Sequence, residues 1–218
     1  MNANKKDVFV SFICVLFSAV AGILCHDFLL GGSILATGLL CAYFTSVGKQ
    51  INYLFGSINY LVMAYAAYVN HLYGLAFFYT FVFLPLQVHG YLMWQKELDK
   101  DNTVKVREFT LKNSIIIVSS CVVGSFILAY ILQFIPGQQL SFLDASSNTT
   151  NLCVVILMML RFKEAWWMWL VNNVIDLVIW ILIVLQGGEN SMMMLLVSIG
   201  YLLINFYGMI KWEIKAKE

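Results

Sequence analysis

Tryptophan and amide side chains stand at regular spacing in the second half of the chain. Trp166, Trp169, Asn173 and Trp180 occupy positions i, i+3, i+7 and i+14, which is one face of an α-helix. Aromatic rings stack on other rings, and a neutral amide both donates and accepts hydrogen bonds. Tryptophan faces also attract a cationic ring, by about 0.5–2 kcal/mol. This face therefore favours a ring-bearing, sugar-like ligand.

Related residues recur in the first half of the chain, which indicates an internal duplication. The motif Lys49-x-x-Asn52-x-x-Phe55-x-x-x-Asn59 aligns with Lys163-x-x-Trp166-x-x-Trp169-x-x-x-Asn173 at an offset of 114 residues. A second motif, Gln87-x-x-Gly90-x-x-x-Trp94, aligns with Asn205-x-x-Gly208-x-x-x-Trp212 at an offset of 118 residues. Membrane carriers are often built from such repeats, with the substrate path between them. Two motif pairs in register therefore predict two copies of one helical unit.

The composition identifies the environment of these units. Of the 218 residues, 61% are hydrophobic and only 11% are charged, whereas a soluble domain is about 45–50% apolar and about 25% charged. The formal net charge of +1 offers no bulk attraction to nucleic acid. A polytopic membrane protein fits these figures. Eight helical spans of roughly 20 residues each would leave no room for a separate soluble catalytic domain.

Short polar stretches divide the chain into eight apolar segments. They cover residues 8–24, 34–47, 51–69, 75–94, 115–135, a short span after the polar stretch 141–151, 166–185 and 192–212. We predict an all-α polytopic membrane protein in which helices 2–4 and 6–8 are duplicated three-helix bundles joined by helix 5. The single transmembrane domain, 1–218, then comprises an extra N-terminal helix (8–30), a first repeat (33–95), a charged cytoplasmic loop with a linker helix (96–136) and a second repeat (146–212).

The distribution of Lys and Arg tests this number of spans independently. With eight spans, all thirteen Lys and Arg residues fall on one side of the membrane. The opposite loops carry Asp27, His71, Asp144 and Glu189. Because basic loops remain in the cytoplasm, both termini are predicted to be cytoplasmic. The first apolar segment also resembles a cleavable secretory signal peptide, but we expect it to be retained as a helix.

We expect the cargo to contact the repeat-matched amides and the tryptophan face. The predicted binding residues are Asn59, Gln87, Trp166, Trp169, Asn173 and Asn205. Spacing alone leaves open whether Asn173 holds helices together or contacts the cargo. Pro85 removes a backbone donor close to Gln87 and should disturb the helix near Phe81. Asp176 is the only charged residue well inside a span, so it is a candidate for coupling or a protonated packing residue.

Other chemistry is disfavoured by the residues that are missing. The five cysteines form no CxxC pair, and no His/Cys ligand spacing occurs, so neither a zinc site nor any cofactor is predicted. The sequence has no GxxxxGK[ST], HExxH or GxSxG motif. A membrane-embedded enzyme or cofactor-binding subunit is therefore a distant alternative. Because no Lys or Arg lies within the spans, a phosphate-bearing cargo is also disfavoured.

Several motifs resemble the PnuC family of bacterial vitamin transporters. They are Asn52-Tyr53-Leu54-Phe55-Gly56-Ser57-Ile58-Asn59, Gly90-Tyr91-x-x-Trp94 and Glu164-x-Trp166-x-x-Trp169-x-x-x-Asn173. The likeness extends from about residue 38 to residue 212. It implies a SWEET-like fold and uptake of nicotinamide riboside by facilitated diffusion, with trapping when a separate cytoplasmic kinase phosphorylates the riboside. Similar relatives carry thiamine or riboflavin, so those vitamins are the alternative cargo.

The resemblance also implies the site and the assembly. Trp166, Trp169 and Asn173 would line the site, with Asn59 and Gln87 facing them from the first repeat. Asp176 stands where the family often has a small polar residue, which leaves proton coupling open. The implied assembly is a homotrimer in the bacterial inner membrane, with one pathway in each protomer.

Overall fold

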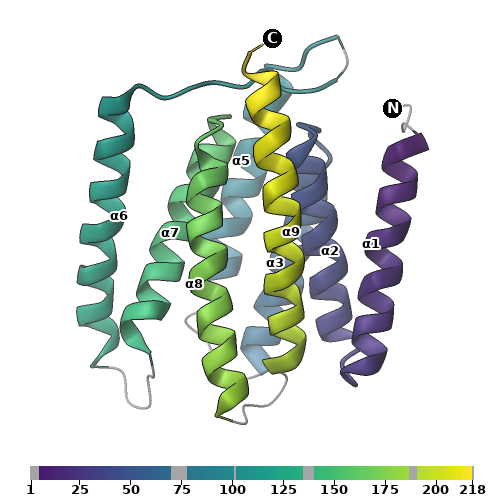
Figure 1. The fold of residues 1–218 in the computed structure, drawn as a ribbon, viewed down its shortest axis with the longest axis vertical. Helices are drawn as coiled ribbons and strands as arrows, with labels where there is room; N and C mark the ends of the chain where they lie inside the picture. Colours follow the sequence, from purple (N-terminus) through teal and green to yellow (C-terminus); the bar gives the residue numbers. More distant parts are fainter. Residues whose placement is uncertain (1–4, 70–77, 101, 135–139, 187–190, 218) are drawn as a thin grey trace.

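The computed structural model describes residues 5–69, 78–100, 102–134, 140–186 and 191–217. Across these ranges the chain forms eight helical rods (Figure 1). They are α1 (Lys5–Leu24), α2 (Leu30–Ser46), α3 (Asn52–Val69), the π-helix η1 (Tyr79–Phe83) continuing into α5 (Leu84–Gln95), α6 (Leu111–Leu132), α7 (Ser141–Met159), α8 (Ala165–Leu185) and α9 (Ser191–Lys215). His71 and Glu189, predicted to lie in loops, are outside the described residues.

The outward faces of these helices are apolar. Among the described residues, five helices are long and apolar enough to cross a membrane, namely α1, α6, α7, α8 and α9. Large hydrophobic side chains such as Phe9 (64% exposed), Phe126 (60%) and Leu203 (68%) point away from the protein interior. Water would disfavour so much exposed apolar surface, whereas lipid accommodates it. The chain is therefore an all-α, multi-pass membrane protein, as predicted.

Two helices flank a central bundle. In Figure 1, α6 lies at one edge beside α7, and α1 lies at the opposite edge beside α2. Between them, α2 packs on α3, α3 packs on η1 and α5, and α8 packs on both α7 and α9. The first group of helices is thus α2, α3, η1 and α5, and the second is α7, α8 and α9. Contacts of α2 with α9 and of α5 with α7 join the two groups. The interior between the groups is thus enclosed by both.

Two fully buried tryptophans join the two groups at one end of the bundle. The Trp94 Nε1–H donates to the backbone oxygen of Met158 on α7, at 3.0 Å. Reciprocally, the Trp212 Nε1–H donates to the backbone oxygen of Thr45 on α2, at 3.0 Å. The two ring centroids are 6.1 Å apart. Each group therefore supplies a ring that binds the first helix of the other group.

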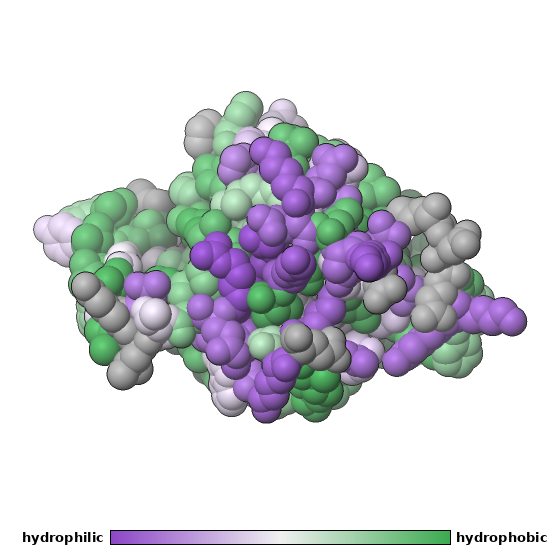
Figure 2. All heavy atoms as spheres, turned by 90° about the horizontal axis from the view of Figure 1, so that it is seen from above, coloured by the Kyte–Doolittle hydropathy of each residue, from purple (hydrophilic) through white to green (hydrophobic). Residues whose placement is uncertain are grey.

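This end of the bundle also carries the charged turns and both termini (Figure 1). Figure 2 shows hydrophilic side chains gathered over the middle of this end and hydrophobic ones around them. Among the described residues, five ion pairs stabilise it: Lys49–Asp7 (2.5 Å), Arg161–Glu97 (2.9 Å), Lys163–Glu108 (2.6 Å), Lys163–Glu213 (3.1 Å) and Lys215–Asp99 (3.7 Å). The hydrogen bond from Arg161 lowers the pKa of Glu97 below its ordinary value. We call this end the basic end.

The loop between α5 and α6 lies across the basic end. Its Val104 is fully buried, and the Val104 N–H donates to the Gly48 oxygen at 3.0 Å. Gly48 adopts a φ of 72°, which glycine tolerates best, in the turn between α2 and α3. The Arg107 N–H donates to the Arg161 oxygen, at 2.8 Å, in the turn between α7 and α8. The loop thereby ties the corresponding turns of both groups together.

One predicted boundary is wrong. The polar stretch 141–151 was expected to precede a short sixth span, but it forms the first half of α7, a helix of 19 residues. Asp144, Ser147, Asn148 and Asn151 lie at i, i+3, i+4 and i+7 and share one face, which lines an internal cavity. Because that face does not meet lipid, its polarity does not interrupt the helix.

The reciprocal tryptophans generate a stability prediction. Trp94→Phe or Trp212→Phe removes an interhelical hydrogen bond and leaves a gap beside the remaining ring. Each change should reduce the free energy of unfolding by about 1–3 kcal/mol, measured as a lower midpoint of thermal unfolding by circular dichroism in detergent. Trp167→Phe is the control, because Trp167 is 61% exposed and should leave the midpoint unchanged. Equal midpoints in all three variants would contradict the proposed role.

Candidate functional site

An internal cavity of about 280 Å³ lies between the two groups of helices. This volume is close to the lower end of ligand pockets, about 300–1,000 Å³. The walls come from both groups, since α2, α3, α5, α7, α8 and α9 all contribute lining residues. On α5, α8 and α9 the lining residues closest to the basic end are Gln87, Trp169 and Tyr201, and Trp94, Trp166 and Trp212 lie nearer to that end on the same helices. The cavity is thus separated from the basic end by the buried tryptophans.

The structure brings most of the predicted site residues to this cavity. Asn59, Gln87, Trp169 and Asn173 line it, as do Asp176 and Trp180. Trp166 and Asn205 do not line it. These two side chains are buried in the layer between the cavity and the basic end.

Trp166 and Asn205 hold α8 against α9. The Trp166 ring centroid lies 5.9 Å from that of Trp212 and 5.1 Å from that of Trp169. A Cβ atom on Gly208 would lie 2.2 Å from the Trp166 ring, so only glycine leaves room for this contact. The Asn205 Nδ2–H donates to the Trp166 backbone oxygen at 3.1 Å. The presence of these residues in the aligned sequence motifs therefore has a packing explanation.

Asn59 combines a packing role with a place in the cavity wall. Its Nδ2 group donates to the backbone oxygen of Ile34 and to the Thr37 hydroxyl, both at 2.9 Å. These bonds attach α3 to α2 and use both amide protons. Only the Asn59 carbonyl oxygen is left to accept a hydrogen bond from a ligand.

Asn173, which the sequence motifs align with Asn59, is arranged differently. It is only 2% exposed, and its Nδ2 atom has no hydrogen-bond partner. The neighbouring Asn172 is 4% exposed, and its Oδ1 atom also has no partner. A buried amide without partners is costly, so both groups are suited to bind a ligand in the cavity that they line.

Asp176 is held by neutral donors. The Ser147 hydroxyl donates to Asp176 Oδ1 at 2.5 Å, and the Asn172 Nδ2–H donates to Asp176 Oδ2 at 2.8 Å. Asp144 lines the same cavity and interacts electrostatically with Asp176. The described lining residues include no Lys, Arg or His. The cavity is therefore acidic and poorly suited to an anionic ligand.

Prediction from the sequence missed the polar face of α7 and three tyrosines. The polar residues Asp144, Ser147, Asn148 and Asn151 were assigned to a stretch between helices, although their helical spacing was a usable signal. Tyr60, Tyr79 and Tyr201 also line the cavity. No periodicity distinguishes them from tyrosines that face lipid.

The π-helix η1 explains how Tyr79 reaches the site. Pro85 lacks the backbone N–H that a regular helix needs, and η1 (Tyr79–Phe83) lies directly before it, around the predicted position of Phe81. The Tyr60 ring stacks on Tyr79 at 6.0 Å and on Phe83 at 5.2 Å. Gln87, one turn beyond η1, lies against Gly56 of α3 and lines the same cavity. The irregular turn thus supplies one aromatic wall of the cavity.

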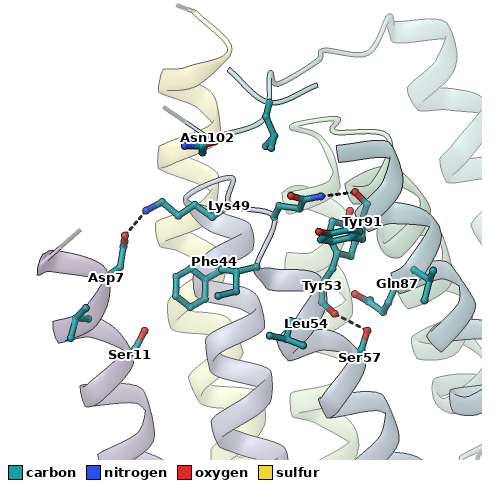
Figure 3. Close-up of a pocket in the computed structure, with 15 residues that line it drawn as sticks. Asp7, Ser11, Phe44, Lys49, Tyr53, Leu54, Ser57, Gln87, Tyr91 and Asn102 are labelled. Carbon is teal, nitrogen blue, oxygen red and sulfur yellow. Dashed lines mark hydrogen bonds and ion pairs between the residues drawn. The ribbon is translucent and has the colours of Figure 1, made fainter. Parts of the chain in front are cut away.

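A larger groove of about 920 Å³ lies between α1 and the helices α3 and α5 (Figure 3). Its charged groups and Gln50 already have partners within the protein, whereas the Tyr53 hydroxyl, which borders it, has none. Lys49 pairs with Asp7 at 2.5 Å, and the Gln50 Nε2–H donates to the Tyr91 oxygen at 2.9 Å. Of the predicted site residues, only Gln87 borders this groove. The internal cavity is therefore the better candidate site.

The candidate site contains no combination of groups that indicates catalysis. In the part of the chain that the structure describes, no cluster of three or more His, Cys, Asp or Glu could hold a metal ion. Multi-pass helices around a polar internal cavity instead define a membrane carrier as the class of protein.

Comparison with known proteins supports this class and identifies the family. Residues 28–214 match the family described as nicotinamide mononucleotide transporter. The nicotinamide riboside transporter PnuC of Neisseria mucosa is 33% identical over 187 residues, covering 84% of this chain and 71% of that protein. The PnuC of Haemophilus influenzae is 29% identical, covering 84% of this chain and 78% of that protein. The chain belongs to the PnuC family of transporters, as its motifs indicated.

A solved structure agrees with this assignment. The crystal structure of the vitamin B3 transporter PnuC superposes with a TM-score of 0.83 at 29% identity, covering 99% of this chain and 94% of that one. The chain is therefore a transporter and not an enzyme.

The different surroundings of two buried asparagines lead to a second prediction. Asn205→Ala removes the bond to Trp166 and should reduce the free energy of unfolding by about 1 kcal/mol, the usual range for side-chain bonds in membranes. Asn173→Ala removes an amide nitrogen without a partner and should leave stability unchanged or slightly higher. Thermal unfolding in detergent without ligand distinguishes the two. A larger loss in Asn173→Ala than in Asn205→Ala would contradict the assignment.

Proposed function

We propose that this protein takes up nicotinamide riboside by facilitated diffusion. The observation that carries this proposal is the internal cavity, where an aromatic ring, unpartnered amides and a carboxylate converge without any basic side chain among the described residues. A pyridine ring can stack on Trp169, and ribose hydroxyls can bond to Asn173, Gln87 and Asn59. The names of the relatives from Neisseria and Haemophilus agree with this cargo.

The cavity favours the riboside over the mononucleotide named in the description of the family. A phosphate needs Arg, Lys or a cluster of backbone N–H groups, and the described lining offers two aspartates instead. Thiamine and riboflavin are the alternative cargo. Thiamine shares a cationic ring with the riboside, whereas riboflavin is neutral and larger.

The proposal includes two repeats of three helices in a SWEET-like arrangement with eight spans. The reciprocal bonds of Trp94 and Trp212 support the duplication, because equivalent residues of the two units bind equivalent helix ends of the opposite unit. The two ties made by the loop between α5 and α6 support it in the same way. In this arrangement α6 is the linker and α1 is an addition.

The basic end is proposed to face the cytoplasm of a bacterium, with both termini there, because basic loops are retained on that side. The cavity then lies on the external side of the buried tryptophans. Without an energy source the carrier only equilibrates its cargo, so we propose that a separate cytoplasmic kinase traps the riboside. A homotrimer with one pathway in each protomer completes the proposal.

Binding measurements test the cargo and the site. Isothermal titration in detergent should give tighter binding of nicotinamide riboside than of nicotinamide mononucleotide. Trp169→Ala and Asn173→Ala should each weaken riboside binding at least about tenfold, the equivalent of about 1.4 kcal/mol. Trp167→Ala is the matched control, since Trp167 points away from the interior. Preference for the mononucleotide would overturn the proposed cargo, and normal binding by both site variants would overturn the site.

Uptake into liposomes tests whether Asp176 couples transport to protons. With the membrane potential clamped at zero, an inward proton gradient should not concentrate the riboside in the wild type. Asp176→Asn should respond to the gradient as the wild type does, although its uptake is slower. Accumulation by the wild type that disappears in Asp176→Asn would show proton coupling and contradict facilitated diffusion.

A further inference from the structure

Asp176 is an unusual group for the middle of a transporter of this composition. It lies within α8, one helical turn from Asn172, and lines the internal cavity together with Asp144 of α7. A carboxylate within the hydrocarbon region is costly unless a partner or water compensates its charge. The groups that surround the Asp176 carboxylate therefore indicate what kind of ligand the cavity would bind.

The hydrogen bonds around Asp176 suit its ionised form. Both of its oxygens accept, one from the Ser147 hydroxyl and the other from the Asn172 amide. An amide N–H can only donate, so Asp176 Oδ2 is the acceptor of the bond from Asn172. Asp144 likewise accepts from the Asn148 Nδ2–H, at 3.0 Å. Neutral donors hold the Asp176 carboxylate in place but do not cancel its charge.

No cation of the described chain neutralises Asp176. Its further electrostatic neighbours are Asp144, Tyr79 and Tyr201, which are acidic or neutral groups. The ion pairs that join two described residues all lie at the basic end. The two carboxylates also repel each other across the cavity. A positively charged ligand beside Asp176 would compensate its charge.

Two buried polar atoms in the wall of the cavity are a second observation that favours a polar ligand. Asn173 Nδ2 and Asn172 Oδ1 have no partner, and both residues line the cavity beside Asp176. One is a donor and the other an acceptor, so together they match a polar molecule rather than a bare ion. The aromatic rings of Trp169 and Trp180 line the same space and add an attraction for a cationic ring.

We propose that Asp176, aided by Asp144, is a specificity determinant that selects a positively charged cargo by pairing with its cationic ring. This inference rests on the proposed function and extends it, because the pyridinium of nicotinamide riboside carries one positive charge. The charge of the cargo, and not only its shape, then decides what enters the cavity. A neutral vitamin of similar size should be excluded.

A matched pair of ligands tests this inference. Nicotinamide riboside and its reduced form, dihydronicotinamide riboside, have the same ribose and carboxamide, but only the first has a cationic ring. Isothermal titration of the purified wild type should show the cation binding at least about tenfold more tightly. Asp176→Asn, which keeps the shape of the side chain, should weaken the cation about tenfold or more and the neutral form less than about twofold.

Further variants separate charge from geometry. Asp144→Asn should reduce the preference for the cation in the same direction but by less. Asp176→Glu should restore much of the preference, because it retains the charge. Glu213→Gln is the control, since Glu213 pairs with Lys163 at the basic end and should leave both affinities unchanged. Equal binding of the two forms by the wild type, or equal losses in Asp176→Asn, would overturn the inference.

The same titrations distinguish this inference from the proposed function. If the wild type binds neither form of the riboside but binds thiamine and not riboflavin, the riboside is the wrong cargo and selection of a cation stands. If the riboside binds and its reduced form binds equally well, the proposed cargo stands and the role of Asp176 is wrong.

Discussion

The structure depends on the reciprocal contact of Trp94 and Trp212. A helix end leaves backbone oxygens without partners inside the helix, and each indole N–H reaches such an end on the opposite group of helices. Because both rings are fully buried, the two groups are joined at one end by bonds that water does not weaken. The same layer separates the cavity from the basic end. One pair of side chains thus supports the assembly of the bundle and the closure of its interior.

Residues that the sequence motifs align have different partners in the two groups of helices, and this difference shapes the candidate site. Asn59 commits both amide protons to α2, whereas Asn173 keeps its amide nitrogen without a partner. Likewise the polar face of α7 turns toward the cavity, with Asp144 in its first turn. A perfectly symmetric pair of bundles would satisfy its own amides and have little affinity for a cargo. The polar atoms of α8 that lack hydrogen-bond partners lower the stability of the protein without ligand, and a ligand that binds them can restore that stability.

Much of the fold could be predicted from the sequence, because lipid allows few solutions. Backbone groups in hydrocarbon must bond within a helix, so apolar runs predict helices and basic residues predict one membrane face. The boundary of α7 could not be found in this way, since hydropathy does not distinguish a polar loop from a polar helix face inside a protein. The site residues were harder still. Trp166 and Trp169 lie on the same predicted helix face, so their spacing does not distinguish them. Trp166 is a packing residue because it contacts Gly208 and Trp212, which are distant in the sequence.

Because charged residues are few in this chain, the position of each one is informative about its role. Thirteen basic residues in a chain of net charge +1 could have lined a path for anions. The described ones lie instead at the basic end, where four of them pair with acidic side chains: Lys49, Arg161, Lys163 and Lys215. The cavity holds charge of the opposite sign, fixed by neutral donors. A phosphorylated cargo would therefore meet repulsion inside the protein and attraction only after leaving it. An unphosphorylated cation would instead be attracted by the cavity and repelled by the basic end. Phosphorylation in the cytoplasm would therefore change the cargo from a form that this cavity accepts into one that it rejects.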